Sequence, residues 1–307
     1  MTAHPPCLLC KSTSEIGEHR WTIEQIEKLY AVIGIDVRGV IFPGRPREAE
    51  ISLLRCTACG FGFFDPELAG DGAYYAAIDR GEYYSVDRPE FQFTLEKARA
   101  RKIETALDYG CGDGAFLNQA RAAGMKTSGV EINEKAARKA QEAGHRMLSD
   151  AELGSGAYDG AFDLVTLFQV LEHVKDPVAK LRECRKLVKP GGYLVAAVPS
   201  ALRLYGLCSH DPMNIPPHHV SWWREQDLAK ALELGGFEIK ETGADQIYGR
   251  ELKEFWLLDQ KLRRALGESV SFPPFLISAV SLLYRGLGLK HWLPHRGLSI
   301  YAMGVAV

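Results

Sequence analysis

Short apolar runs alternate with helical patterns from Thr105 to the end of the chain. The runs are TALDY, TSGVEI, HRMLS, AFDLVTLFQV, YLVAAVP, FEIKETG and LSIYAMGVAV. This alternation is typical of a parallel sheet built from βαβ units. AFDLVTLFQV is apolar on both faces, which predicts a central strand covered by helices on both sides. The pattern therefore predicts an α/β fold with a Rossmann-like sheet of seven strands.

The helices between these strands have recognisable ends. Gly124 stands where a left-handed residue closes the helix AFLNQARAA, and Asn133 caps the helix EKAARKAQEAG. A third helix begins with Asp176 as its cap and Pro177 at its first position, where a missing N–H costs nothing. This helix is expected to end at KPGG. Residues 228–234 form one more helix before the sixth strand.

The pattern divides the chain into three parts. Residues 1–65 carry two C-x-x-C pairs and few apolar repeats, so this head needs a staple to fold. Residues 66–100 are predicted to be a helical connector, and residues 101–307 the sheet domain. Within that domain, residues 247–296 turn helical and aromatic, which predicts an insertion before the last strand. Its most apolar stretch, residues 272–289, is interpreted as a buried helix.

Composition and charge narrow the classes of function. The chain has 307 residues, 46% hydrophobic and 25% charged, which is the balance of a globular protein. A net charge of -2 attracts neither a nucleic-acid backbone nor an anionic membrane. The amino terminus lacks the basic start and apolar run of a signal peptide, and no stretch is long enough to span a membrane. We therefore expect a cytoplasmic protein with no nucleic-acid partner.

A glycine-rich turn joins the first strand of the sheet to the following helix. The text DYGCGDGAFL places Gly110, Gly112 and Gly114 where small residues let a ligand approach a helix amino terminus. Dinucleotide enzymes usually show G-x-G-x-x-G, so the tighter spacing favours a ligand without a phosphate. Asp108, just before the turn, is placed to receive an amino group of that ligand. The alternative is a turn that serves packing alone.

Glu131 ends the second strand. It lies close to the offset of about 20 residues at which an acidic side chain meets ribose hydroxyls in such units. Its two oxygens can accept hydrogen bonds from both hydroxyls at once. The alternative is a solvated loop carboxylate, which the glycine turn upstream makes the less favoured interpretation.

The chain resembles a known family over residues 105–245. The matching text is ALDYGCGDGAFL, GVEIN, FDLVTLFQVLEHVKDP, LVKPGGYLVAAVPS, HHVSWW and LELGGFEI, in this order. It resembles the class I S-adenosylmethionine-dependent methyltransferases, in particular the ubiquinone-biosynthesis-like subgroup with an added zinc-binding amino terminus. The resemblance implies a methyltransferase that uses S-adenosylmethionine, and it does not specify the substrate.

The resemblance also implies where the cofactor lies. It puts the methionine end at Gly110 and Gly112, the ribose on Glu131, and the adenine beside Ile132.

Four further cofactor positions follow from the resemblance. Asp150 and Ala151 match the place where the family holds the adenine amino group, although the loop ELGSGAYDGA after them is longer and richer in glycine than usual. Phe168 and Gln169, at the end of the fourth strand, match positions that line the methyl donor. Phe168 is interpreted equally well as core.

Two histidines face the acceptor if the resemblance holds, His173 in LEHV and His219 in PPHHV. A histidine can accept a hydroxyl proton as the methyl group arrives, so each is a candidate general base. LEH occurs across the superfamily with many acceptors, which favours a structural role for His173. Methyl transfer from a sulfonium can also proceed by orientation and exclusion of water alone, so a base is not required.

Two C-x-x-C pairs in the head predict a structural zinc. The four thiolates are those of Cys7, Cys10, Cys56 and Cys59. Lys11 departs from the glycine usual in the first knuckle, and 45 residues separate the pairs, far more than in compact ribbons. The insertion HRWTIEQIEKLYAVIG has helical spacing and indicates an elaborated head. Four free thiols, or a redox-active pair, are the alternative.

The predicted acceptor is a small molecule with an apolar or aromatic portion, methylated on oxygen. Nothing basic marks a polymer substrate, and aromatic residues gather between His218 and Trp292, where they form either pocket walls or ordinary core. Methylation of a sugar or nucleotide sugar on carbon or nitrogen is the alternative. A nucleic-acid methyltransferase lacks its basic patch, and intact glycines argue against a catalytically silent interaction protein. The oligomeric state stays open.

Overall fold

The computed structural model describes residues 4–78, 88–201, 210–246, 249–269 and 296–307. The chain forms two compact units. Unit 1 comprises residues 1–78, 199–224 and 244–298. Unit 2 comprises residues 79–198, 225–243 and 299–307. The division predicted at residues 65 and 100 stays a prediction about the domains.

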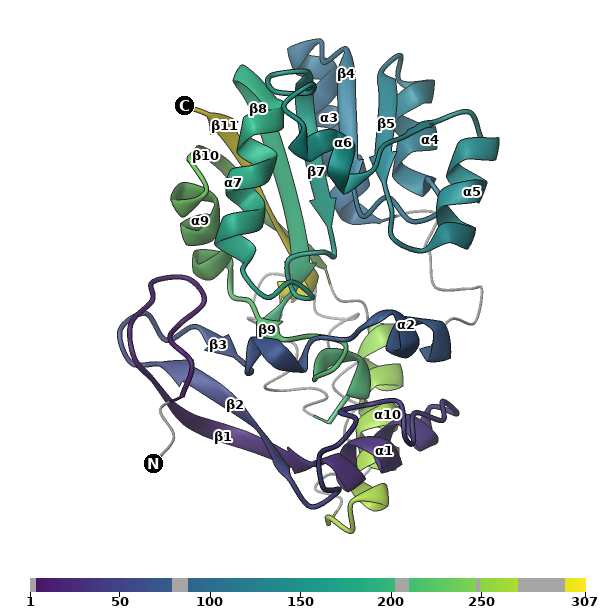
Figure 1. The fold of residues 1–307 in the computed structure, drawn as a ribbon, viewed down its shortest axis with the longest axis vertical. Helices are drawn as coiled ribbons and strands as arrows, with labels where there is room; N and C mark the ends of the chain where they lie inside the picture. The colour runs from purple at the N-terminus through teal and green to yellow at the C-terminus, as the bar shows by residue number, and fades with distance from the viewer. Residues whose placement is uncertain (1–3, 79–87, 202–209, 247–248, 270–295) are drawn as a thin grey trace. The chain divides into compact units, whose positions relative to one another are not determined.

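Unit 2 is built on the predicted seven-stranded sheet, whose strand order is β10-β11-β8-β7-β4-β5-β6 (Figure 1). The pairs β5–β6, β4–β5, β4–β7 and β7–β8 are parallel, as the βαβ pattern predicts. The fold class is therefore confirmed. The strands are β4 (Thr105–Tyr109), β5 (Lys126–Val130), β6 (Arg146–Met147), β7 (Phe162–Phe168), β8 (Val188–Pro199), β10 (Phe237–Gln246) and β11 (Arg296–Ala306).

Helices cover both faces of this sheet, and their caps follow the sequence. Asn133 accepts the backbone N–H of Lys135 at 3.0 Å, and Asp176 accepts that of Ala179 at 2.9 Å. Gly124 is left-handed, with φ 94°. The helices are α3 (Pro89–Arg101), α4 (Ala115–Ala122), α5 (Glu134–Glu142), α6 (Asp150–Gly154), α7 (Pro177–Leu187) and α9 (Glu225–Leu234).

One predicted boundary is wrong. The helix α7 ends at Leu187 and β8 begins at Val188, so KPGG lies within the strand rather than at the end of the helix. Val188 pairs with Phe162 on the neighbouring strand β7. The strand therefore begins before the proline and glycines, which then lie inside it.

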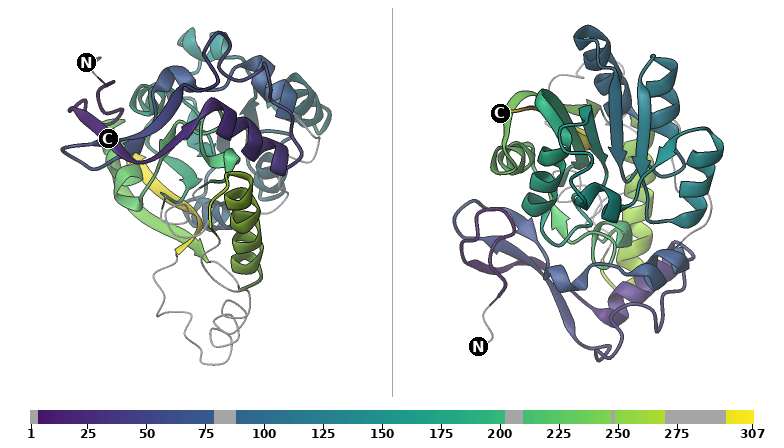
Figure 2. Two further views of the ribbon diagram at one scale, coloured as in Figure 1. Left: turned by 90° about the horizontal axis from the view of Figure 1, so that it is seen from below. Right: turned by 45° about the horizontal axis from the view of Figure 1, so that its top comes forward.

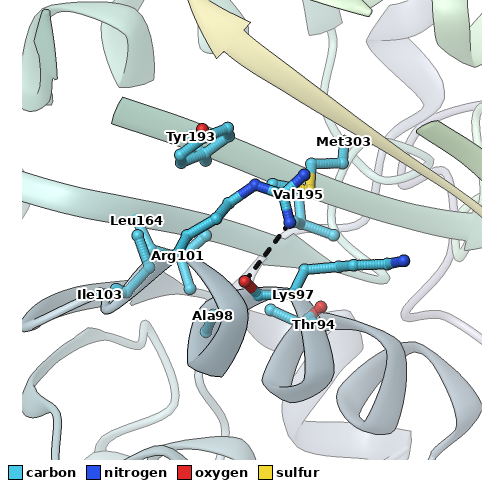
Figure 3. A pocket seen from close by; sticks show the side chains of 9 residues that line it. All are labelled: Thr94, Lys97, Ala98, Arg101, Ile103, Leu164, Tyr193, Val195 and Met303. Atoms are coloured by element: carbon cyan, nitrogen blue, oxygen red, sulfur yellow. Dashed lines mark hydrogen bonds between the residues drawn. The ribbon is translucent and has the colours of Figure 1, made fainter. Parts of the chain in front are cut away.

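Alternate strand residues face α3 and α4, where they form one core. Ala106, Leu164 and Val195 pack there with Phe91 and Phe116. A cavity of about 10 Å³ lies beside α3, which is room for roughly one water molecule and far below a cofactor pocket (Figure 3). We interpret it as a packing gap. Its lining residues are Thr94, Lys97, Ala98, Arg101, Ile103, Leu164, Tyr193, Val195 and Met303.

Unit 1 contains a second, antiparallel sheet in the order β1-β2-β3-β9 (Figures 1 and 2). The helical spacing predicted from His19 begins later, at Ile23, because Thr22 caps the helix with a capping box and His19 belongs to the strand before it. The elements are β1 (Ser14–Thr22), α1 (Ile23–Val32), β2 (Glu50–Cys56), β3 (Gly62–Phe63), η1 (Pro66–Leu68), α2 (Gly72–Ile78), η2 (Pro212–Asn214), β9 (Ser221–Trp222) and α10 (Gly249–Ala265).

Aromatic side chains fill the core of unit 1. Trp21, Tyr30, Tyr74 and Trp222 are almost fully buried, and Leu262 of α10 packs in the same cluster. The helix α10 falls within the predicted insertion, whereas residues 270–295, including the predicted buried helix, lie outside the described residues. Among the helices that the structure describes, none is both long and apolar enough to cross a membrane.

Candidate functional site

The glycine turn after β4 uses a backbone conformation that only glycine adopts without strain. Gly110, Gly112 and Gly114 have φ of 80°, 56° and 88°. A Cβ atom on Gly110 would lie 2.6 Å from Cγ2 of Val170, so the space is closed as well. The turn is tied to the next strand by the Gly110 N–H, which donates to the carbonyl of Val130 at 2.8 Å. Both the backbone conformation and the space at Gly110 therefore require glycine.

Glu131 is held in one orientation by two backbone amides. The Gly112 N–H donates to Oε2 at 2.8 Å, and the Asn133 N–H donates to Oε1 at 2.7 Å. The half-buried carboxylate thus lies directly against the glycine turn. Each carboxylate oxygen has further lone pairs, so both can still accept a hydroxyl proton.

Asp108 is buried beneath this turn, with 3% of its surface exposed. Its Oδ1 accepts a hydrogen bond from the Thr166 hydroxyl at 2.7 Å. Burial is the main reason that the pKa of Asp108 is raised to about 7; the charge of Glu131 acts in the same direction, and the hydrogen bond from Thr166 and the charge of Arg88 oppose them. Thr166 lies on the neighbouring strand β7 and belongs to no sequence motif. The sequence therefore did not predict its contact with Asp108.

The predicted adenine positions lie at the surface of unit 2. Ile132 is 76% exposed, so its apolar side chain is accessible to a ligand. Asp150 is the first residue of α6, and both it and Ala151 are exposed. The Asp150 carboxylate accepts a hydrogen bond from the hydroxyl of Tyr109, a residue that sequence reasoning did not single out.

Phe168, predicted to line the methyl donor or the core, is buried at the end of β7. Its ring centroid lies 5.0 Å from that of Phe91 and 4.9 Å from that of Phe116. These contacts place the side chain in the core beneath α3 and α4.

Gln169 follows directly and has a left-handed backbone, with φ 59°, which is strained for a side chain of this kind. Its amide nitrogen donates to Oε1 of Glu90 at 3.1 Å and to Oγ of Ser299 at 3.2 Å. Such strain at the end of a central strand is frequent at functional sites. Glu90 is buried and comes from α3, outside every motif in the sequence.

The two candidate bases belong to different units. His173 lies in unit 2 and is half-buried, with Nε2 3.8 Å from Oε1 of Glu172. Burial raises the pKa of Glu172 to about 8. His219 lies in unit 1, where its ring stacks on that of His218 at 4.7 Å, and the ring of Tyr74 lies 6.0 Å from His218. The joint role of His173 and His219 at one acceptor stays a prediction.

The four predicted metal ligands lie together in unit 1. All four sulfur atoms are within 4.8 Å of one another. The Sγ distances are 3.7 Å for Cys7–Cys59, 3.4 Å for Cys10–Cys56 and 3.6 Å for Cys10–Cys59. Tetrahedral zinc with Zn–S bonds of about 2.3 Å requires sulfur atoms about 3.8 Å apart. The thiol cluster therefore fits a closed zinc site.

Both departures from a compact ribbon have a structural reason. Lys11 has φ 59° and Gly60 has φ 71°, so the lysine takes the left-handed conformation that glycine takes in the second knuckle. The long separation is bridged because β1 pairs with β2, which sets Ser14 opposite Cys56. The helix α1 lies between these two strands in the sequence.

Comparison with known proteins identifies the class. A methyltransferase domain family matches residues 80–242, and the chain belongs to this family. The class predicted from the sequence, a class I S-adenosylmethionine-dependent methyltransferase, is thereby confirmed.

Two individual relatives match a smaller part of the chain than the family does. A ubiquinone biosynthesis O-methyltransferase of Thiobacillus denitrificans is 39% identical, over 44% of this chain and 65% of the relative. One of Aromatoleum aromaticum is 31% identical, over 44% of this chain and 64% of the relative. The match thus spans slightly less than two thirds of each relative. A SAM-dependent methyltransferase structure from Archaeoglobus fulgidus is 18% identical with a TM-score of 0.47, over 76% of this chain and 99% of that one.

Proposed function

We propose that this protein transfers the methyl group of S-adenosylmethionine to a hydroxyl of a small molecule with an apolar or aromatic portion. The observation that carries the cofactor part is the Glu131 carboxylate, held by two amides against a left-handed glycine turn. Two relatives whose names describe an O-methyltransferase support oxygen as the acceptor atom. The net charge of -2 supports a small acceptor rather than a polyanion.

In this proposal the cofactor binds to residues of unit 2. The Glu131 carboxylate accepts hydrogen bonds from the ribose hydroxyls in this proposal, and Ile132 offers an apolar face to the adenine. Asp108, once ionised, attracts the ammonium group of the methionine part. Gly110 and Gly112 let that part approach the backbone. When bound, the cofactor supplies an electrophilic methyl group on a sulfonium.

The chain's own contribution to the chemical step is orientation and the handling of one proton. In an oxygen methylation the acceptor oxygen forms a bond to the methyl carbon, the carbon–sulfur bond breaks, and its electron pair stays on the sulfur. The hydroxyl proton leaves to a base or to water. His219 is our candidate for that base, because it is a buried imidazole in a cluster of aromatic rings in unit 1. His173 is the second candidate.

Labelled methyl donor with a metabolite pool, followed by mass identification of the product, tests the reaction. A methylated phenol or hydroxy acid supports the proposal. A methylated sugar, transfer RNA or protein, or no product at all, contradicts it. Calorimetry with S-adenosylhomocysteine and with NAD tests the cofactor separately, and tight binding of NAD alone would remove the central claim.

The role of His219 has its own test. His219→Ala is expected to lower turnover roughly 100-fold at neutral pH while leaving cofactor affinity nearly unchanged. His218→Ala, which changes the stacked neighbour, is the matched control. An unaltered rate in the His219 variant would make this residue part of the wall.

We further propose that Cys7, Cys10, Cys56 and Cys59 hold one structural zinc. Four thiolates leave no open position for a substrate, so the metal supplies folding free energy rather than chemistry.

A further inference from the structure

A half-buried tyrosine connects the glycine turn to the predicted adenine position within unit 2. Tyr109 ends β4, between Asp108 and Gly110. Its hydroxyl donates to Oδ1 of Asp150 and accepts a hydrogen bond from Nζ of Lys180 at 2.9 Å. The Lys180 ammonium also lies 4.5 Å from the centre of the tyrosine ring. Three side chains from β4, α6 and α7 therefore form one chain of hydrogen bonds.

The direction of this chain is fixed by its chemistry. An ammonium group can only donate, so the Tyr109 oxygen must be its acceptor and the Tyr109 hydrogen must go to Asp150. Burial raises the pKa of Tyr109 to about 12, and the hydrogen bond to Asp150 acts in the same sense, so the hydroxyl keeps its proton at neutral pH. Lys180 is itself held by Glu183 at 2.6 Å.

Asp150 is thereby oriented from two sides. Its backbone begins α6, where Ser149 and Glu152 form a capping box. Its Oδ1 is occupied by Tyr109, which leaves Oδ2 of this exposed side chain toward solvent or a ligand. An ionised carboxylate only accepts hydrogen bonds, so it selects a donor such as an amino group and repels a carbonyl oxygen.

We propose that Tyr109 and Lys180 are positioning residues that aim Oδ2 of Asp150 at the 6-amino group of the cofactor's purine. The pair thus sets a preference for adenine over hypoxanthine. This inference rests on the proposed function, because it requires the cofactor to bind at Glu131 and Ile132.

Calorimetry with S-adenosylhomocysteine and S-inosylhomocysteine tests it, since the second ligand replaces the amino group by a carbonyl. The wild type is expected to bind the adenine form at least about tenfold more tightly. Tyr109→Phe and Lys180→Met are expected to reduce that ratio by about 3- to 10-fold. Asp150→Asn, which offers an amide donor to the carbonyl, is expected to reverse the preference.

Two controls separate positioning from general support of the fold. Tyr158→Phe removes a hydroxyl that also bonds a cation, Arg146 at 2.5 Å, and should leave the ratio unchanged. In an Asp150→Ala background, Tyr109→Phe should no longer alter the ratio, because a residue that acts through Asp150 has nothing left to orient. Melting temperatures of all variants show whether they fold.

Three outcomes would overturn the positioning role of Tyr109 and Lys180. An unchanged ratio in folded Tyr109→Phe protein overturns the inference while leaving the cofactor claim intact. Equal weakening of both ligands assigns Tyr109 and Lys180 to the fold alone and also overturns it. A wild type that binds neither nucleoside contradicts the proposed function, and the inference falls with it.

Discussion

The hydroxyl of Thr166 donates to the carboxylate of Asp108 across two neighbouring strands, with 2.7 Å between Oγ1 and Oδ1. Thr166 is thus a hydrogen-bond partner of the Asp108 carboxylate, which lies just before the glycine turn. It does not compensate for burial, because the pKa of Asp108 is still raised to about 7. The cofactor-free protein therefore holds a proton at this position in mildly acidic solution.

The first prediction concerns stability and pH. Asp108 is protonated in the folded state up to about pH 7, whereas its unfolded pKa is 3.8. The stability from this group is therefore complete below the unfolded pKa and is lost as pH rises through about 7. Asp108→Asn should flatten this part of the fall in the free energy of unfolding. Denaturant titrations of both proteins from pH 4 to pH 8 measure the difference, and parallel curves would exclude the effect.

The second prediction concerns cofactor affinity. A cationic ligand favours the ionised form of Asp108, so the affinity for S-adenosylmethionine should fall by up to about tenfold for each pH unit below the pKa. The Asp108→Asn variant should bind more weakly at pH 8 and depend less on pH. Calorimetry at several pH values checks both. An unchanged pH dependence in the variant would show that another group takes up the proton.

The third prediction separates backbone strain from ligand approach. Gly110 and Gly124 are both left-handed, with φ of 80° and 94°, so alanine at either position should cost about 1–2 kcal/mol of stability. A Cβ atom at Gly124 meets nothing within 4 Å, whereas at Gly110 it would lie 2.6 Å from Val170. Gly110→Ala should therefore also abolish cofactor binding, and Gly124→Ala should retain it. Retained binding in folded Gly110→Ala protein would mean that the turn serves packing alone.

The fourth prediction concerns the metal. Protein purified without chelator should contain about one zinc per chain, and a Cys56→Ala, Cys59→Ala double variant should contain none. Removal of zinc should unfold the head while the sheet of unit 2 survives, because the metal acts locally. Cys184→Ala, which changes a buried thiol of unit 2, is the control. Elemental analysis measures the content, and metal retained by the double variant would rule out this ligand set.

Features encoded locally could be predicted from the sequence. The glycine turn, the caps Asn133 and Asp176, and the strand pattern all depend on neighbours within a few residues, and the structure contains each of them. The grouping of the four cysteines could be predicted over a long separation because paired C-x-x-C motifs are typical of a metal site.

Partners that meet only through the sheet could not be predicted. Lys180 lies 71 residues from Tyr109, and Thr166 lies 58 residues from Asp108. The first pair depends on how α7 packs on the sheet and the second on which strands become neighbours, and neither leaves a local pattern. Val188 shows the same limit, since its pairing with Phe162 moves the start of β8 ahead of the expected turn.

The two amides that hold Glu131 come from different loops, one after β4 and one after β5. The carboxylate therefore links the two loops, and neither loop can shift without breaking a hydrogen bond to Glu131. Groups held in this way lose little conformational entropy when a ligand binds. A change at Asn133, whose backbone N–H bonds Glu131 and whose side chain caps α5, is consequently expected to loosen the carboxylate that we propose for the ribose.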